Sequence, residues 1–342
     1  MAGDISGAYR VSSKLVKKHP VHPLAWVEYA ACLALKYEFS RADQAIEKAL
    51  KHSKGSIDLY LIAAEAMVAS SFGSTAVSIL RKARNIEPGN HQINIRLASE
   101  LERQHDVEEA QNLVNEVLSS HLQPPISSEA LLIHATLLKR NNNADKAVEV
   151  LDELIHSTPN TEDTQDTLWK ALNLRILCLD NLHRYAEAIE AFYTASDFTQ
   201  KFYTQSISSC RTSWLQRKQT MHNLSQAITC EKLLAWQMNP SVCDHSLTFL
   251  SGHPRSGTTL TGTILSSHPD SVLIDEKDIF FTDTLIPLAR EFPKGTPDIE
   301  RIEKASEKSI TRHVGNYLKQ AEKCVQQSII GKTIIDKHPL HI

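Results

Sequence analysis

The same residue types recur along the N-terminal part of this chain at a nearly fixed interval. Ala42, Ala76 and Ala110 are separated by 34 residues each time. The same interval links three further series, which are Ile46, Leu80 and Val114; Ala49, Ala83 and Val117; and Ala30, Ala64 and Ala98. An internal period of this length predicts a stack of small units, because each unit has an apolar face that only a neighbour can cover.

Two further units follow at longer intervals. The fourth begins 37 residues on and contains Ala135, Ala147, Leu151, Leu154 and Pro159. The fifth lies 41 residues beyond it and contains Leu172, Ile176, Tyr185, Ala188, Phe192 and Ala195. Small residues allow two antiparallel helices to approach closely, and a proline such as Pro88 or Pro159 ends a helix. Each unit is therefore predicted to be a pair of helices.

This pattern resembles the tetratricopeptide repeat over residues 8–200, in about five units. The resemblance implies a helical superhelix whose concave surface binds a peptide or protein. The alternative is a scaffold or dimerisation element without a ligand of its own. Residues 201–243 also carry apolar residues at helical spacing, and we expect them to cap the array and to bridge to the next domain.

The composition of the chain limits its partners. The 342 residues suggest about two domains, and the net charge of −3 gives no reason to expect nucleic acid or an anionic membrane as a partner. The N-terminus has no apolar leader, and no stretch reaches the roughly 18 apolar residues of a membrane span. The six cysteines form no CxxC pair, which argues against a zinc site or a disulfide framework. We therefore expect a cytoplasmic protein with reduced thiols and no metal.

The composition changes at Ser246. A short apolar run at 247–250 predicts a strand, the segment from Gly252 to Gly257 predicts a tight loop, and residues 258–265 predict a helix. A strand, a glycine-bounded loop and a helix together form a phosphate site, because loop N–H groups and the helix N-terminus attract anions. In the nucleotide-binding consensus G-x-x-x-x-G-K-[ST] a lysine would stand at Thr258, so an ATPase or kinase is disfavoured.

The segment from Pro254 to Leu260 resembles the phosphosulfate-binding loop of sulfotransferases that use 3′-phosphoadenylyl sulfate (PAPS), and protein-tyrosine sulfotransferases in particular. Asp275-Glu276 and the segment 334–340 follow at the spacing of that family. The predicted fold class is accordingly mostly α, with a tetratricopeptide-repeat superhelix followed by an α/β P-loop-type sulfotransferase domain at 244–342. The arginine and serine that grip the 3′-phosphate in that family have no counterpart before Ile342. We therefore expect this domain to be partial and marginally folded.

The resemblance implies a role for each matching residue. PAPS would be the sulfuryl donor, and its 5′-phosphosulfate would be held by Arg255, Ser256, Gly257, Thr258, Thr259 and Leu260. Glu276 would be the general base for an acceptor hydroxyl, and Lys337, with Arg255, would neutralise charge during transfer. Protein tyrosine is one candidate acceptor, although Asp278 follows Lys277 where that family has an arginine that contacts substrate.

Each of these residues also has a structural interpretation. Arg255 could pair with a surface carboxylate, Glu276 could belong to a solvated acidic turn, and Lys337 could lie at the end of a sheet with its ammonium in water. The competing function is a non-catalytic repeat scaffold that binds a protein partner and carries a vestigial nucleotide loop. A P-loop kinase is the third alternative.

Overall fold

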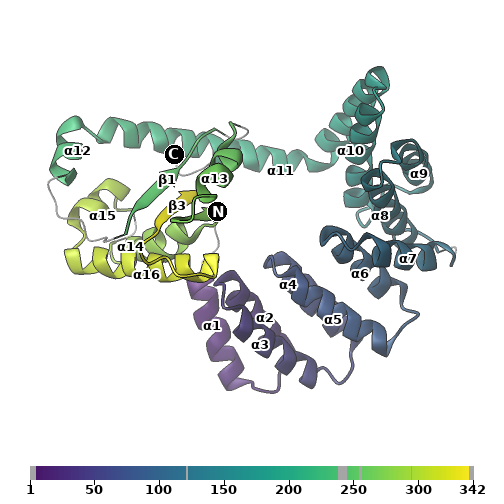
Figure 1. Ribbon diagram of the computed structural model, residues 1–342, viewed down its shortest axis with the longest axis horizontal. Coiled ribbons are helices and arrows are strands. Elements are labelled where there is room, and N and C mark those ends of the chain that lie inside the picture. Colours follow the sequence, from purple (N-terminus) through teal and green to yellow (C-terminus); the bar gives the residue numbers. More distant parts are fainter. Residues whose placement is uncertain (1–4, 121, 238–244, 254–255, 294, 339–342) are drawn as a thin grey trace. The chain divides into compact units, whose positions relative to one another are not determined.

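The computed structural model describes residues 5–120, 122–237, 245–253, 256–293 and 295–338. The chain is mostly helical, and it has a three-stranded sheet in its C-terminal part (Figure 1). It divides into two compact units. One contains Met1–Pro20, Glu28–Gln44 and Trp214–Ile342, and the other contains Val21–Val27 and Ala45–Ser213. The predicted mostly helical class is confirmed at this level.

The N-terminal helices form pairs, as the repeat interval predicts. After α1 (Ile5–Lys18), the pairs are α2 (Pro23–Leu35) with α3 (Phe39–His52), α4 (Ile57–Ala69) with α5 (Gly73–Ile86), α6 (His91–Arg103) with α7 (Val107–Leu118), α8 (Ile126–Arg140) with α9 (Ala144–Ser157), and α10 (Gln165–Asn181) with α11 (Tyr185–Ala227). α12 (Cys230–Gln237) follows. In the described parts of the chain, no helix combines the length and the apolar composition needed to cross a bilayer.

One alanine in the second helix of each pair is buried against its neighbours. Ala42, Ala76, Ala110 and Ala147 are 0% exposed, and Ala188 is 8% exposed. A methyl group at this point lets the two helices of a pair approach closely, and larger apolar residues such as Leu80 and Leu151 fill the space beside it. The alanine interval in the sequence therefore marks one buried position in the second helix of each pair.

A left-handed residue joins the two helices in every pair. Tyr37, Ser71, His105, Asn142 and His183 have φ between 57° and 65°, and they follow one another at 34, 34, 37 and 41 residues. The N–H of the residue after each one donates to a carbonyl five positions earlier, as in Phe72 to Met67 and Asp106 to Leu101. This hydrogen bond is the Schellman motif, which ends a helix and reverses the chain.

The unit from Ala45 to Ser213 is held together by contacts between successive pairs. The first helices touch one another directly, α6 with α8 and α8 with α10. Ion pairs join successive pairs on the surface, including Arg84 with Glu116 at 3.1 Å and Arg140 with Glu102. Because first helices of successive pairs meet directly, we infer that they line the inner side of this stack.

The C-terminal part contains a parallel sheet with helices packed against it. Its elements are β1 (Leu247–Leu250), α13 (Thr258–Ser266), β2 (Ser271–Asp275), the π-helix η1 (Phe281–Leu285), α14 (Ile286–Ala289), α15 (Asp298–Lys304), α16 (Glu307–Val325) and β3 (Thr333–Lys337). The strand order is β1-β3-β2, and both pairings are parallel. Val272, Ile274 and Ile334 form a core with Tyr317 and Ala321 of α16. β3 is buried because it lies between the other two strands.

Leu151→Ala should destabilise the repeat array. The Leu151 side chain is 0% exposed and belongs to a core with Ala147, Leu154 and Leu168, so its truncation leaves a cavity. We expect a loss of about 2–5 kcal/mol in the free energy of unfolding, measured by urea titration followed by far-UV circular dichroism. Glu153→Ala, an exposed position on the same helix, should change it by less than about 0.5 kcal/mol. A loss below about 1 kcal/mol for Leu151→Ala would contradict this core.

Candidate functional site

The predicted site residues converge at the carboxyl edge of the sheet. In the strand register, Lys337 at the end of β3 lies opposite Leu250 of β1 and Asp275 of β2. The N–H of Glu276 donates to the carbonyl of Lys337 at 2.8 Å, which carries the pairing one residue beyond β2. The loop after β1 and the turn after β2 therefore lie on either side of Lys337, as expected where parallel strands end together.

Two glycines shape the loop after β1. A Cβ at Gly252 would lie 2.9 Å from Ser256 Oγ and 2.9 Å from Thr258 Cγ2, so a side chain has no room there. Gly257 has φ +87° and precedes the first residue of α13, a conformation that glycine adopts without steric cost. The first turn of α13 has N–H groups without intrahelical acceptors, which favours an anion at this end of the helix. Glycine at 252 and 257 therefore fits a phosphate-type loop.

The remaining loop residues are placed unequally. Arg255, with Pro254, lies outside the described residues, so its predicted contact with phosphate stays a prediction. Ser256, Thr259 and Leu260 are exposed, and Thr258 begins α13. The hydroxyl of Thr259 accepts a hydrogen bond from Lys337 Nζ at 3.3 Å. This contact links the loop to the predicted lysine.

Lys337 is a buried ammonium with three oxygen partners. Its side chain is 1% exposed, and Nζ lies 2.5 Å from Asp275 Oδ1, 2.6 Å from Glu276 Oε1 and 3.3 Å from Thr259 Oγ1. An ammonium has three N–H donors, so these three oxygens match them. Burial, the largest influence, lowers the pKa of Lys337, but Asp275 and Glu276 together hold that pKa above its ordinary value. Lys337 therefore stays charged at neutral pH.

Glu276 adopts an uncommon backbone conformation. Its φ of 52° is in the left-handed region, which a glutamate rarely occupies and which costs conformational energy. The next residues also anchor the turn, because Asp278 Oδ1 lies 3.1 Å from His338 Nε2 and the carbonyl of Asp278 accepts from the Thr282 hydroxyl at 3.0 Å. The Glu276 side chain is 53% exposed, so a molecule from solvent can reach its carboxylate.

The residues at this edge fit a phosphate or sulfate group. Gly252 carries no Cβ to crowd the loop, and the N-terminal end of α13 favours an anion, while the ammonium of Lys337 beside the loop is paired with Asp275 and Glu276. Ser251 Oγ is buried and has no hydrogen-bond partner within the described structure. A buried hydroxyl without a partner is costly, and an anionic oxygen would satisfy it. The arrangement can therefore bind an anion beside a carboxylate that is open to solvent.

Two buried residues near this edge have no role in the predicted site. Asp336 is 0% exposed and accepts a hydrogen bond from the Tyr317 hydroxyl at 2.9 Å, while its Oδ1 has no partner in the described structure. Burial raises the pKa of Asp336 to about 6, against the opposing effects of Tyr317 and His338. The sequence could have pointed to Asp336, because it is an acidic residue that directly follows the apolar residues Ile334 and Ile335. It could not have pointed to Tyr317, which belongs to no motif.

Comparison with known proteins identifies the helical repeats. Residues 95–161 match the tetratricopeptide repeat family. Similar solved structures include the MamA protein (15% identity, 52% of this chain and 92% of that chain, TM-score 0.39) and YrrB, described as a tetratricopeptide-repeat protein with an unusual peptide-binding site (16% identity, 60% and 100%, TM-score 0.37). A third is the Cut9–Hcn1 hetero-tetramer of APC/C (14% identity, 57% and 37%, TM-score 0.43). No curated protein matches the chain.

The family match confirms the predicted repeat class for residues 95–161. The solved structures have TM-scores of 0.43 or less, and they carry no argument about function. The predicted sulfotransferase resemblance finds no support in these comparisons, and the roles of Arg255, Glu276 and Lys337 stay predictions.

Asp336→Asn should change how stability depends on pH. An aspartate has a pKa near 3.9 in an unfolded chain, whereas Asp336 has a pKa of about 6 in the folded state. The folded protein holds this proton more tightly, so Asp336 favours folding below about pH 4 and this contribution is lost as the pH rises through about 6. Relative to wild type, Asp336→Asn should gain about 2 kcal/mol in unfolding free energy between about pH 4.5 and pH 7.5, measured by urea titration.

Asp270→Asn is the matched control, because Asp270 is exposed on the segment that precedes β2. Its stability difference from wild type should be the same at both pH values. An equal difference at both pH values for Asp336→Asn would mean that Asp336 is not held in its protonated form.

Proposed function

We propose that this chain binds a peptide or protein partner through its helical repeats. The observation that carries this proposal is the tetratricopeptide-repeat match at residues 95–161, which lies inside a stack of helical pairs. Such stacks bury their apolar residues between neighbouring pairs and leave one continuous surface for binding. This function needs no chemistry in the C-terminal part.

The inner side of the stack offers specific contacts for that partner. Ile62 on α4 and Arg96 on α6 occupy equivalent positions of successive pairs, 34 residues apart, and both are exposed. Ile62 is 45% exposed, so its side chain is available for apolar contact. An apolar side chain and a guanidinium at equivalent positions of successive pairs suit a peptide with an apolar residue and a carboxylate. We propose that Ile62 and Arg96 contact the partner.

Selection from a random peptide library with the full chain as bait tests this proposal. Peptides recovered by the wild type should lose at least about tenfold in affinity with Arg96→Glu, because a carboxylate would then face a reversed charge. Ile62→Asp should also lose about tenfold or more by removing apolar contact. Lys146→Glu, an exposed lysine on the second helix α9, is the matched control and should stay within about twofold. Equal losses in all three variants would argue against the inner side as the binding surface.

A second candidate function is sulfuryl transfer from PAPS to a hydroxyl, and the cluster at Lys337 favours it. One ammonium contacts both a loop hydroxyl, Thr259, and the carboxylate of Glu276, although the three residues are far apart in the sequence. A structural lysine at the end of a strand would need one counter-ion. A lysine that joins a phosphate-type loop to a solvent-accessible carboxylate supports the proposal of group transfer.

The residues would divide the chemistry as follows. PAPS, when bound, supplies a sulfuryl group linked to a phosphate that can leave. The loop from Ser256 to Leu260, with Arg255, would bind the phosphosulfate. Glu276 would accept the proton of the attacking hydroxyl on a carboxylate oxygen. Lys337 would hold positive charge where negative charge develops, which is the larger part of catalysis for such transfers.

Calorimetric titration with adenosine 3′,5′-bisphosphate tests the second function. Wild type should bind, and Lys337→Met should weaken binding by about tenfold or more through loss of the buried charge. Lys308→Met, an exposed lysine on α16, should bind like wild type. Glu276→Gln should keep nucleotide binding but lose about a hundredfold or more in transfer to a hydroxyl acceptor, because the base is gone. No binding by the wild type at millimolar nucleotide would leave the repeats as the functional part of the chain.

A further inference from the structure

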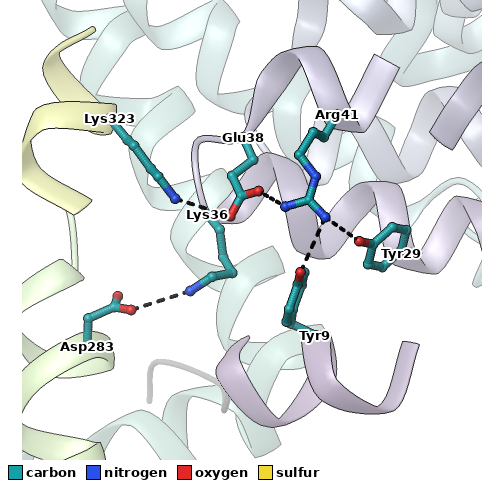
Figure 2. Close-up of polar contacts among 7 residues, drawn as sticks. All are labelled: Tyr9, Tyr29, Lys36, Glu38, Arg41, Asp283 and Lys323. Atoms are coloured by element: carbon teal, nitrogen blue, oxygen red, sulfur yellow. Dashed lines mark hydrogen bonds and ion pairs between the residues drawn. The ribbon is translucent and has the colours of Figure 1, made fainter. Parts of the chain in front are cut away.

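The turn between α2 and α3 is docked onto the C-terminal elements of its own compact unit. Lys36 Nζ lies 3.4 Å from Asp283 Oδ1 of η1, and Lys323 Nζ of α16 lies 3.2 Å from Glu38 Oε1. Figure 2 shows both ion pairs. Lys36, Glu38 and Asp283 have side chains that are 13–15% exposed, so these ion pairs are partly withdrawn from water. Glu38 is held in turn by Arg41 (Figure 2). The first helical pair is thus joined to the C-terminal elements by specific polar contacts.

Tyr37, between these two ion pairs, departs from the pattern of the other turns. The equivalent left-handed positions in the four later pairs are Ser71, His105, Asn142 and His183. Asparagine and histidine tolerate φ near +57° better than most residues, whereas a bulky aromatic residue there carries a conformational cost. Tyr37 has φ 57° all the same. A residue that is costly for the turn itself indicates that its side chain has another role.

The Tyr37 side chain packs against the C-terminal core. It contacts the cluster that contains Val272, Ile274 and Tyr317, and it shares a hydrogen bond with Cys324 of α16. Lys277 Nζ lies 5.8 Å from the centre of the Tyr37 ring, within the range of a cation–π contact. Burial and the neighbouring Cys324, with smaller effects of Asp278 and Asp283, raise the pKa of Tyr37, so its hydroxyl stays protonated.

Lys277 and Asp278 directly follow Glu276, so Tyr37 lies against the turn that carries the candidate base. Contacts from the end of β3 also hold that turn, and they include the hydrogen bond from the Glu276 N–H to the carbonyl of Lys337, the ion pair of Lys337 with Glu276, and the contact of His338 with Asp278. Within the next turn, the Thr282 hydroxyl donates to the carbonyl of Asp278. The Tyr37 ring adds a contact from a different part of the sequence. Because Glu276 has a strained φ of 52°, its conformation depends on such surrounding contacts.

We infer that Tyr37 is a positioning residue, which fixes the turn from Glu276 to Asp278 and makes the first helical pair part of the candidate site. The effect of Tyr37 on sulfuryl transfer rests on the proposed sulfuryl-transfer function. The effect of Tyr37 on the conformation of the turn does not depend on that function.

Amide hydrogen exchange of the full chain, followed at Glu276 and Thr282, tests this inference. Tyr37→Asn keeps a residue that accepts the left-handed conformation, as Asn142 does, but removes the ring. We expect it to speed exchange at both amides by about tenfold or more, because the turn opens more often. Tyr37→Phe keeps the ring, so the exchange rates of both amides should stay within about twofold of wild type. Ser71→Asn introduces asparagine at the equivalent position of the second pair and should leave the exchange rates of both amides unchanged.

Unchanged exchange at Glu276 and Thr282 in Tyr37→Asn would overturn the inference, and so would equal acceleration in Ser71→Asn. Titration with adenosine 3′,5′-bisphosphate tests the proposed sulfuryl transfer separately from the exchange experiment. A wild type that binds no nucleotide refutes sulfuryl transfer, while the exchange rates still decide whether Tyr37 holds the turn. Where transfer is measured, Tyr37→Asn should lower kcat about tenfold and leave nucleotide affinity within about twofold, since Tyr37 contacts the turn after β2. A loss of nucleotide affinity with unchanged kcat would contradict a positioning role at Glu276.

Discussion

Two helices can cross at close range only where neither carries more than a methyl group, and this steric limit underlies the N-terminal part of the chain. Ala42, Ala76, Ala110, Ala147 and Ala188 meet it in the five helical pairs. Close crossing brings the ends of the two helices near each other, so a single left-handed residue can reverse the chain. The pairs formed in this way are alike enough to stack, and stacking buries residues such as Leu80 and Leu151 that a single pair would expose.

The sequence predicted this part well because its constraint repeats. The intervals of 34, 34, 37 and 41 residues in the alanine series reappear unchanged in the positions of the reversing turns. The turn residues themselves could not be predicted, since Tyr37, Ser71, His105, Asn142 and His183 differ in size and shape and none of them is the glycine that usually occupies this position. The sequence also did not indicate where the repeat array ends. α11 continues from Tyr185 to Ala227, with a non-helical backbone at Tyr203, because no proline or glycine interrupts that stretch.

The candidate site could be predicted only in part. Thr259, Glu276 and Lys337, which the motifs single out one by one, lie together because parallel strands place their carboxyl ends at one edge. The second carboxylate on Lys337, Asp275, follows from the register of β2 against β3, which no motif encodes. Tyr317 and Tyr37 were beyond prediction, since each reaches the site region through packing between distant segments. Local spacing specifies a loop or a strand end, whereas such long-range contacts depend on the assembled core.

The unequal turn residues have a consequence for how such a chain can change over time. Pairs that contact only their neighbours can be duplicated, shortened or exchanged by recombination with little effect beyond the adjacent pair. The second to fifth pairs, with small or polar turn residues, meet that condition at their turns. The first pair does not, because Tyr37 and its flanking charges match surfaces on η1 and α16 that no other pair is built to fit. Variation in repeat number should therefore accumulate behind the first pair, which is inherited together with the C-terminal elements.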